Sequence, residues 1–176
     1  MNVYVGKRDC VNRKLPATFN NSQSIADRKY GDRYEKKFHR IIEEWCECKF
    51  DDGKTGWEQM DFINKENKLA FELKRRRIKK FQYEDIIISF SKYQYARNLM
   101  RKGYAVYFFW KFTDELCFWK VPTILPKSVR IDKGGTYKRG FREVCDCLYI
   151  PMSDLLNFKE FPSYIDYMET NKLTNI

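Results

Sequence analysis

The stretch WEQMDFINKENKLAFELKR, at residues 57–75, holds two short apolar runs separated by a polar connector. Within residues 57–63 and 69–75, apolar and polar side chains alternate, which is typical of strands with one buried face. The connector NKENK, at residues 64–68, is short enough to join the two runs as an antiparallel hairpin. We therefore predict two paired strands here.

The facing of side chains along this hairpin brings charged groups together. Glu72 and Lys74 share one face of the second strand, because strand side chains alternate with a period of two. A turn centred on Glu66 and Asn67 places Asp61 directly opposite Glu72, with Cβ atoms within about 5.5 Å. A shift of one residue in the pairing would separate the two carboxylates.

The elements around the hairpin indicate one α/β domain. A helix is expected at 30–46, where apolar residues recur at spacings of three and four. In chain order we further expect a short strand at 3–5, an extended run at 83–89, a helix at 92–102 behind a capping box at 91–94, strands at 104–112, 116–121, 129–131 and 147–150, and helices at 153–158 and 164–171. The predicted architecture is a mixed sheet flanked by helices, in the order αβββαβ. It occupies 28–160, between a basic segment at 1–27 and a helical tail at 161–176.

Composition narrows the class of protein and its partners. The 176 residues include 34 Lys and Arg against 24 Asp and Glu, a formal net charge of +10 that favours a polyanionic partner. No apolar run is long enough to span a membrane, and no phosphate-binding Gly-rich loop indicates a nucleotide cofactor. The first residues lack the apolar segment of a secretory signal, so we expect a cytoplasmic protein with reduced thiols.

The carboxylates of Asp61 and Glu72 form a set of hard oxygen donors of the kind that suits Mg²⁺, which binds through one or two carboxylates and keeps waters. Lys74 on the same face could polarise a water or stabilise a developing oxyanion. Glu35, on the preceding helix, could supply a third carboxylate. The alternative interpretation is that Lys74 merely opens a solvated basic run, since Asp, Glu and Lys are abundant in this chain.

Three short motifs in this order resemble the PD-(D/E)xK nuclease superfamily. They are GDRYE at 31–35, MD at 60–61 and FELK at 71–74, and the resemblance extends over about residues 28–121. The superfamily includes type II restriction enzymes, Holliday-junction resolvases and recombination exonucleases. One departure is Met60, which stands where the motif has proline. The resemblance is also compatible with a phage or viral origin.

The resemblance implies a restriction-endonuclease-like fold and a metal-dependent endonuclease that hydrolyses phosphodiester bonds in DNA, with branched DNA as one candidate substrate. It implies that Asp61, Glu72 and the Leu73 carbonyl bind Mg²⁺ or Mn²⁺ with help from Glu35, and that Lys74 activates or positions water. Lys92 or Gln94 would reach the same cleft from the later helix. Resolvases act as symmetric dimers, so a homodimer is a further expectation.

Several features retain a second interpretation. The basic run could bind DNA phosphates or be a solvated strand end; its members are Arg75, Arg76, Arg77, Lys79 and Lys80. Some aromatic residues, Tyr93 and Tyr95 among them, could stack on bases or belong to the core. Two Cys-x-Cys pairs could hold zinc, although free thiols are the default. The rival functions are a non-catalytic nucleic-acid-binding module with the same fold and an RNA endonuclease.

Overall fold

The computed structural model describes residues 22–52, 60–135 and 144–161. The strand expected at 3–5, the helix expected at 164–171 and nearly all of the two flanking segments lie outside these ranges. No helix within the described ranges is long and apolar enough to cross a membrane.

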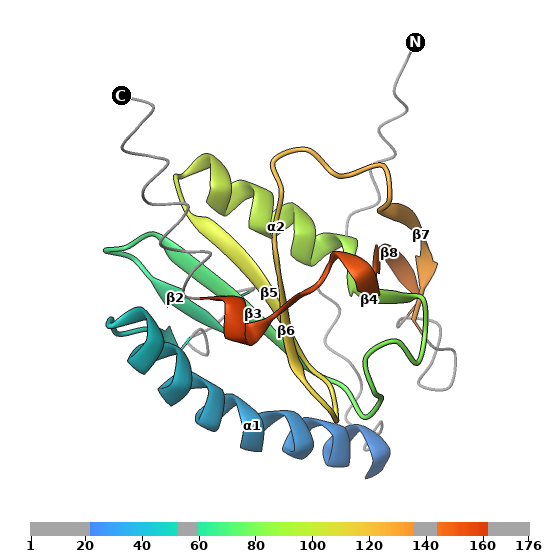
Figure 1. The fold of residues 1–176 in the computed structure, drawn as a ribbon, viewed down its shortest axis with the longest axis horizontal. Coiled ribbons are helices and arrows are strands. Elements are labelled where there is room, and N and C mark those ends of the chain that lie inside the picture. The colour runs from blue at the N-terminus through green and yellow to red at the C-terminus, as the bar shows by residue number, and fades with distance from the viewer. Residues whose placement is uncertain (1–21, 53–59, 136–143, 162–176) are drawn as a thin grey trace, which may run out of the picture.

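A six-stranded mixed sheet forms the centre of the molecule (Figure 1). Its strands, in spatial order, are β1 (Asp51–Asp52), β2 (Phe62–Asn64), β3 (Leu69–Arg75), β5 (Ala105–Lys111), β6 (Leu116–Lys120) and β9 (Leu156–Asn157). The two central strands, β3 and β5, run parallel, whereas every other neighbouring pair is antiparallel. This mixed sheet with flanking helices confirms the predicted restriction-endonuclease-like α/β architecture.

Helix α1 (Ser22–Cys46) covers one face of this sheet (Figure 1). Phe38 and Ile42 are one turn apart and fully buried, in one core cluster with Phe71 and Leu73 of β3. The helix begins eight residues before the expected start at 30. The spacing of its apolar residues predicted the buried stripe but not the polar turns that precede it.

Helix α2 (Phe90–Arg101) covers the opposite face of the sheet (Figure 1). Ala96 and Leu99 are buried there in a second core cluster with Phe108 and Trp110 of β5. Because side chains alternate along a strand, those of β3 point alternately toward α1 and toward α2. Phe71 and Leu73 face α1, and Glu72 belongs to the side of α2.

The capping box predicted at 91–94 is wrong. The N-cap of α2 is Ser89, whose side chain makes no capping bond, and Ser91 instead donates to the Ser89 hydroxyl at 3.2 Å. The reason is that the helix starts directly at the end of strand β4, which ends at Ser89. Ser91 thus lies inside the first turn, and Gln94 is exposed on the helix surface.

A second sheet of three strands lies beyond the N-terminal end of α2 (Figure 1). Strand β8 (Cys145–Pro151) is central, between β4 (Asp85–Ser89) and β7 (Arg130–Gly134), and both pairings are antiparallel. Because β4 and α2 together connect β3 to β5, this small sheet is attached to the segment that follows the predicted catalytic strand.

The helix expected at 153–158 is wrong. The chain forms a 3₁₀ turn at Met152–Asp154, the short strand β9, and another 3₁₀ turn at Phe158–Glu160. The backbone of β9 pairs with the free edge of β6 and forms hydrogen bonds with it. A helix at this place would leave the backbone groups at that edge of β6 without these partners. A capping box does form here, between Asn157 and Glu160.

Candidate active site

The hairpin of β2 and β3 has the register that the sequence predicts. Phe62 pairs with Phe71, so Asp61 stands across from Glu72. The backbone N–H of Asp61 donates to the Phe71 carbonyl at 3.0 Å, and the Asp61 carboxylate accepts the N–H of Leu73 at 2.7 Å. The Asp61 side chain thereby continues the ladder beyond the strand and is held against β3.

Glu72 is a wholly buried carboxylate, with 0% of its surface exposed. One of its oxygens forms an ion pair with Lys74, and the other accepts from Lys92 of α2 at 2.7 Å. Desolvation raises the pKa of Glu72, the ammonium of Lys74 lowers it, Asp61 raises it and Lys92 lowers it, with a net upward shift. We refer to Asp61, Glu72, Lys74 and Lys92 as the Glu72 cluster.

Lys74 is held in its charged form. Burial lowers its pKa, but the carboxylates of Glu72 and Asp61 act in the opposite direction and leave the pKa raised above the ordinary value of 10.5. In this arrangement Lys74 is therefore an ammonium at neutral pH. It can donate hydrogen bonds and stabilise negative charge, and it is not a base.

The cluster offers oxygen donors suited to a hard divalent cation. The side chains of Asp61 and Glu72 are two carboxylates on one face, which fits Mg²⁺ or Mn²⁺ because such ions take one or two carboxylates together with water. Among the residues the structure describes, no three acidic, histidine or cysteine side chains surround one point. Both Glu72 oxygens face ammonium groups, so binding of a cation at Glu72 requires at least one lysine side chain to move.

Glu35 is not brought into a group with Asp61 and Glu72. It lies half-buried on α1, the helix that covers the opposite face of the sheet, with its carboxylate next to Gly31. Its assistance to a metal ion stays a prediction. The lone histidine, His39, contacts the Phe50 carbonyl at 3.0 Å and Glu43 at 3.4 Å, which agrees with a packing role.

The predicted DNA-binding residues divide between the two faces of β3. Arg76 lies on the side of Glu72. Burial lowers the pKa of its guanidinium, and the Glu72 carboxylate partly offsets that effect. Arg75 and Arg77 lie on the side of α1, where both guanidiniums stack on Tyr30. Of the lysines further along the run, Lys79 is exposed, whereas Lys80 turns inward to Glu115 at 3.6 Å.

A basic groove on α1 was missed by sequence reasoning. It has a volume of about 700 Å³ and is lined by five cations and two tyrosines: Lys29, Tyr30, Arg33, Tyr34, Lys37, Arg75 and Arg77. Arg75 fixes its floor, with the guanidinium 3.5 Å from the centre of the Tyr30 ring and a 2.7 Å hydrogen bond to the Tyr30 carbonyl. The four-residue spacing from Lys29 to Lys37 was the available signal, because it places three cations on one helix face. We refer to this basic groove as the α1 groove.

The four cysteines of the two Cys-x-Cys pairs do not form a zinc site in the part of the chain that the structure describes. All four are free thiols, and Cys145 and Cys147 lie with their sulfurs 3.8 Å apart.

A comparison with known protein families gives a match that includes the hairpin and the Glu72 cluster. A family model described as "Phage putative PDDEXK endonuclease" matches residues 23–159, most of the chain. The chain belongs to this family. The matched range contains the whole Glu72 cluster, all of α2 and all but the first residue of α1, and it supports the resemblance to PD-(D/E)xK nucleases and nuclease activity. No curated protein matches the chain.

Proposed function

We propose that this phage-type PD-(D/E)xK protein is a divalent-metal-dependent DNA endonuclease, with the Glu72 cluster as its active site. The single observation that carries the proposal is the contact of Glu72 with Lys74 on one strand face, with Asp61 held opposite by the Leu73 N–H. These residues stand at the motif positions that the resemblance to PD-(D/E)xK nucleases singles out.

The residues would divide the work as follows. Asp61 and Glu72, with the Leu73 carbonyl, would hold the cation, which when bound would polarise a phosphodiester oxygen and lower the pKa of water. The Lys74 ammonium would donate to the phosphate oxygens or to the attacking water as negative charge develops. Lys92 would keep Glu72 ionised and oriented.

The charge distribution supports a nucleic-acid substrate. The chain carries ten more cations than anions, and the α1 groove gathers five of the cations with no acidic residue among those that line it. Cations arranged in this way bind phosphates with little regard to sequence, which positions a strand but does not specify it. The Glu72 cluster and the α1 groove lie on opposite faces of β3, so a DNA molecule that contacts both would have to pass around the end of that strand.

The test is cleavage of supercoiled plasmid, linear duplex and branched DNA with MgCl₂ or MnCl₂ and with EDTA. Wild type is compared with Asp61→Ala and Lys74→Ala. Lys102→Ala is the matched control, because Lys102 is exposed at the far end of α2. We expect metal-dependent cutting by wild type and Lys102→Ala, and a loss of at least about 100-fold in the other two variants. Equal activity in all four proteins would overturn the assignment.

A second candidate is a binding module that retains the fold without catalysis. The observation that favours it is the occupation of both Glu72 oxygens by Lys74 and Lys92. It predicts salt-dependent DNA binding with no cutting under any metal. An RNA endonuclease is separated from a DNA endonuclease by competition between the two substrates, and a homodimer is tested by light scattering of the full chain.

A further inference from the structure

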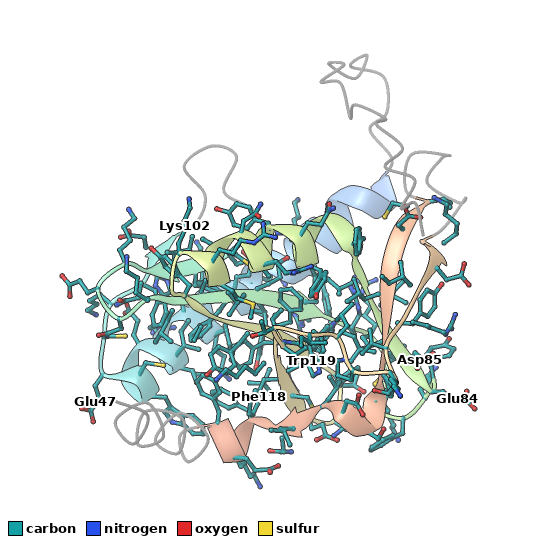
Figure 2. The ribbon with its side chains drawn as sticks, turned by 90° about the horizontal axis from the view of Figure 1, so that it is seen from above. Glu47, Glu84, Asp85, Lys102, Phe118 and Trp119 are labelled. Atoms are coloured by element: carbon teal, nitrogen blue, oxygen red, sulfur yellow. The ribbon has the colours of Figure 1, made fainter. Side chains whose placement is uncertain are left out.

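A pocket of about 990 Å³ opens between the segment that follows β3 and the three-stranded sheet. Its lining includes Arg76, Phe81, Tyr83, Asp85, Arg130 and Tyr149. Figure 2 shows Glu84, which also lines the pocket, and Asp85 at one end of the molecule, on the opposite side of the view from Glu47 and Lys102. The volume of the pocket lies within the range of about 300–1,000 Å³ that is usual for ligand sites.

Arg76 connects this pocket to the Glu72 cluster. Its side chain forms part of the pocket wall, and it follows Lys74 by two residues, with its N–H donating to the Lys111 carbonyl of β5 at 2.8 Å, which places it on the Glu72 side of the strand. A DNA strand whose phosphate lies at Glu72 would therefore pass the mouth of this pocket. Arg76 therefore makes the pocket a neighbour of the Glu72 cluster.

Two aromatic side chains of the pocket are exposed to an unusual degree. Phe81 is 65% exposed and Tyr83 is 59% exposed. Rings of this size are normally placed where they bury most of their surface, as Phe71 and Phe109 are in the core. Two aromatic rings separated by one residue, beside cationic side chains that include Lys80 at 4.9 Å from the centre of the Phe81 ring, suit a flat partner that carries negative charge nearby.

The turn that presents Phe81 is well fixed. Lys79 and Gln82 close it with two hydrogen bonds, from the Gln82 N–H to the Lys79 carbonyl at 3.2 Å and from the Lys79 N–H to the Gln82 side chain at 3.3 Å. The Lys80 N–H is tied to Asp114 at 3.0 Å. Phe81 itself has φ of 63°, a left-handed conformation that a bulky residue rarely adopts. The fold thus holds the exposed ring in an unfavourable backbone conformation.

The far wall of the pocket adds charge and a third ring. The Arg130 guanidinium lies 3.8 Å from the centre of the Tyr149 ring and pairs with Asp85 at 3.2 Å. The walls of the pocket thus combine aromatic faces, carboxylate acceptors and two guanidiniums. Aromatic faces stack on nucleobases, carboxylates accept hydrogen bonds from base amino groups, and guanidiniums bind phosphates.

We propose that this pocket receives an unpaired nucleobase of the DNA strand that lies across the Glu72 cluster, a proposal that rests on the proposed endonuclease function. A base inside an intact duplex has its faces covered by its neighbours and cannot enter a pocket with aromatic walls. The preferred substrate is therefore DNA with at least one unpaired nucleotide beside the cleaved bond. Single strands, flaps, branch points and flipped bases share this feature.

The test measures binding in EDTA, so that no cutting takes place. The probe is a short single-stranded oligonucleotide carrying one 2-aminopurine, compared with the same sequence as a duplex. The variants are Phe81→Asn, which suits the left-handed backbone and removes the ring, and Tyr83→Ala. Ile124→Ala is the control, because Ile124 is 84% exposed and does not line the pocket.

We expect wild type and Ile124→Ala to quench the 2-aminopurine and to favour the single strand. Each pocket variant should weaken single-strand binding at least about five-fold and leave duplex binding and its salt dependence unchanged. Phe81→Asn should melt at or above the wild-type temperature, which excludes misfolding as the cause. Unchanged single-strand binding in both variants, or equal loss for both DNA forms, would overturn the proposal.

The outcome is separable from that of the endonuclease proposal. Base-dependent binding that is lost in Phe81→Asn, in a protein that cuts no DNA, would retain the pocket and remove the catalytic assignment. Metal-dependent cutting by a protein that binds single strand and duplex equally would retain the nuclease and remove the pocket.

Discussion

Lys92, near the start of α2, donates a 2.7 Å hydrogen bond to Glu72, a wholly buried carboxylate in the middle of β3. The helix that closes one face of the sheet is in this way joined to the strand that carries the family motif. Desolvation favours the neutral form of Glu72 and raises its pKa, and the ammonium groups of Lys74 and Lys92 act in the opposite direction. The ionised state that a metal ligand needs thus depends on two lysines from different elements.

Replacing Lys92 with methionine should lower the free energy of unfolding by about 1.5–3 kcal/mol, since a hydrogen bond between charged groups is lost and Glu72 stays buried. Urea denaturation measures this. The control is Lys102→Met, at the exposed end of the same helix, which should change stability by no more than about 0.5 kcal/mol. Equal stabilities of the two variants would show that the Lys92 contact contributes nothing.

Adding MnCl₂ should stabilise the wild-type protein against unfolding, because a ligand that binds only the folded state adds free energy. At a hundred-fold excess over the dissociation constant the gain is about 2.7 kcal/mol. Asp61→Ala should lose this gain, whereas Asp51→Ala, a change at an exposed edge-strand carboxylate, should keep it. A metal-dependent shift that survives in Asp61→Ala would place the cation elsewhere. Thermal melting with and without the metal decides between the two.

The hairpin and the central strands could be predicted because their signals are local. A five-residue connector between two alternating runs leaves little freedom in the register, and Phe62 does pair with Phe71 as the turn at 66–67 requires. The strands expected at 104–112 and 116–121 form at 105–111 and 116–120, with their bounds moved by a residue. The contact of Glu72 with Lys74 follows from the same alternation.

Other parts depend on contacts between distant segments. The pairing of Arg130 with Tyr149 in the three-stranded sheet, and of Cys117 with Asn157 at the edge of β6, joins segments that no short-range pattern links. Tyr93, for which the sequence is compatible with base stacking or with the core, is buried in the core because α2 turns that face to the sheet. The exposed rings that take up that role in our proposal, Phe81 and Tyr83, lie in a turn with no periodicity to reveal them.

The thiol of Cys117 should make stability depend on alkaline pH. Burial in β6 raises its pKa to about 12, so the fold favours the neutral thiol. Its contribution is fully present below the ordinary thiol pKa of 9.0 and is lost as the pH rises towards 12. The stability difference between wild type and Cys117→Ala should therefore shrink above pH 9, by up to about 1.4 kcal/mol per pH unit. A difference that stays constant from pH 8 to 10.5 would contradict the prediction.

Two glycine-to-alanine changes should have opposite signs. Gly31 lies inside α1, where an added Cβ would meet, among the described side chains, only that of Glu35 at 3.9 Å, so Gly31→Ala should stabilise the helix by about 0.5–1 kcal/mol. Gly134 lies in β7, where a Cβ would come within 2.9 Å of the Cys147 sulfur, so Gly134→Ala should cost about 1–3 kcal/mol. Each variant serves as the control for the other in thermal melts, and a shift in the same direction for both would be inconsistent with the packing described.

The α1 groove should carry much of the salt dependence of DNA binding. Lys29, Arg33 and Lys37 lie on one helix face above Arg75 and Arg77, and each phosphate that a cation neutralises in a duplex contributes about −0.9 to the slope of log K against log salt. Alanine at all three helix positions should therefore make the slope less steep by up to about 0.9 per residue, with weaker binding of every sequence alike. The control is the double variant Arg101→Ala and Lys102→Ala, which removes two exposed cations at the end of α2. If the groove is the main contact, this variant should leave the slope nearly unchanged. Equal slopes for the groove variant and the wild type would mean that the DNA follows another path, past Arg76 and the pocket alone.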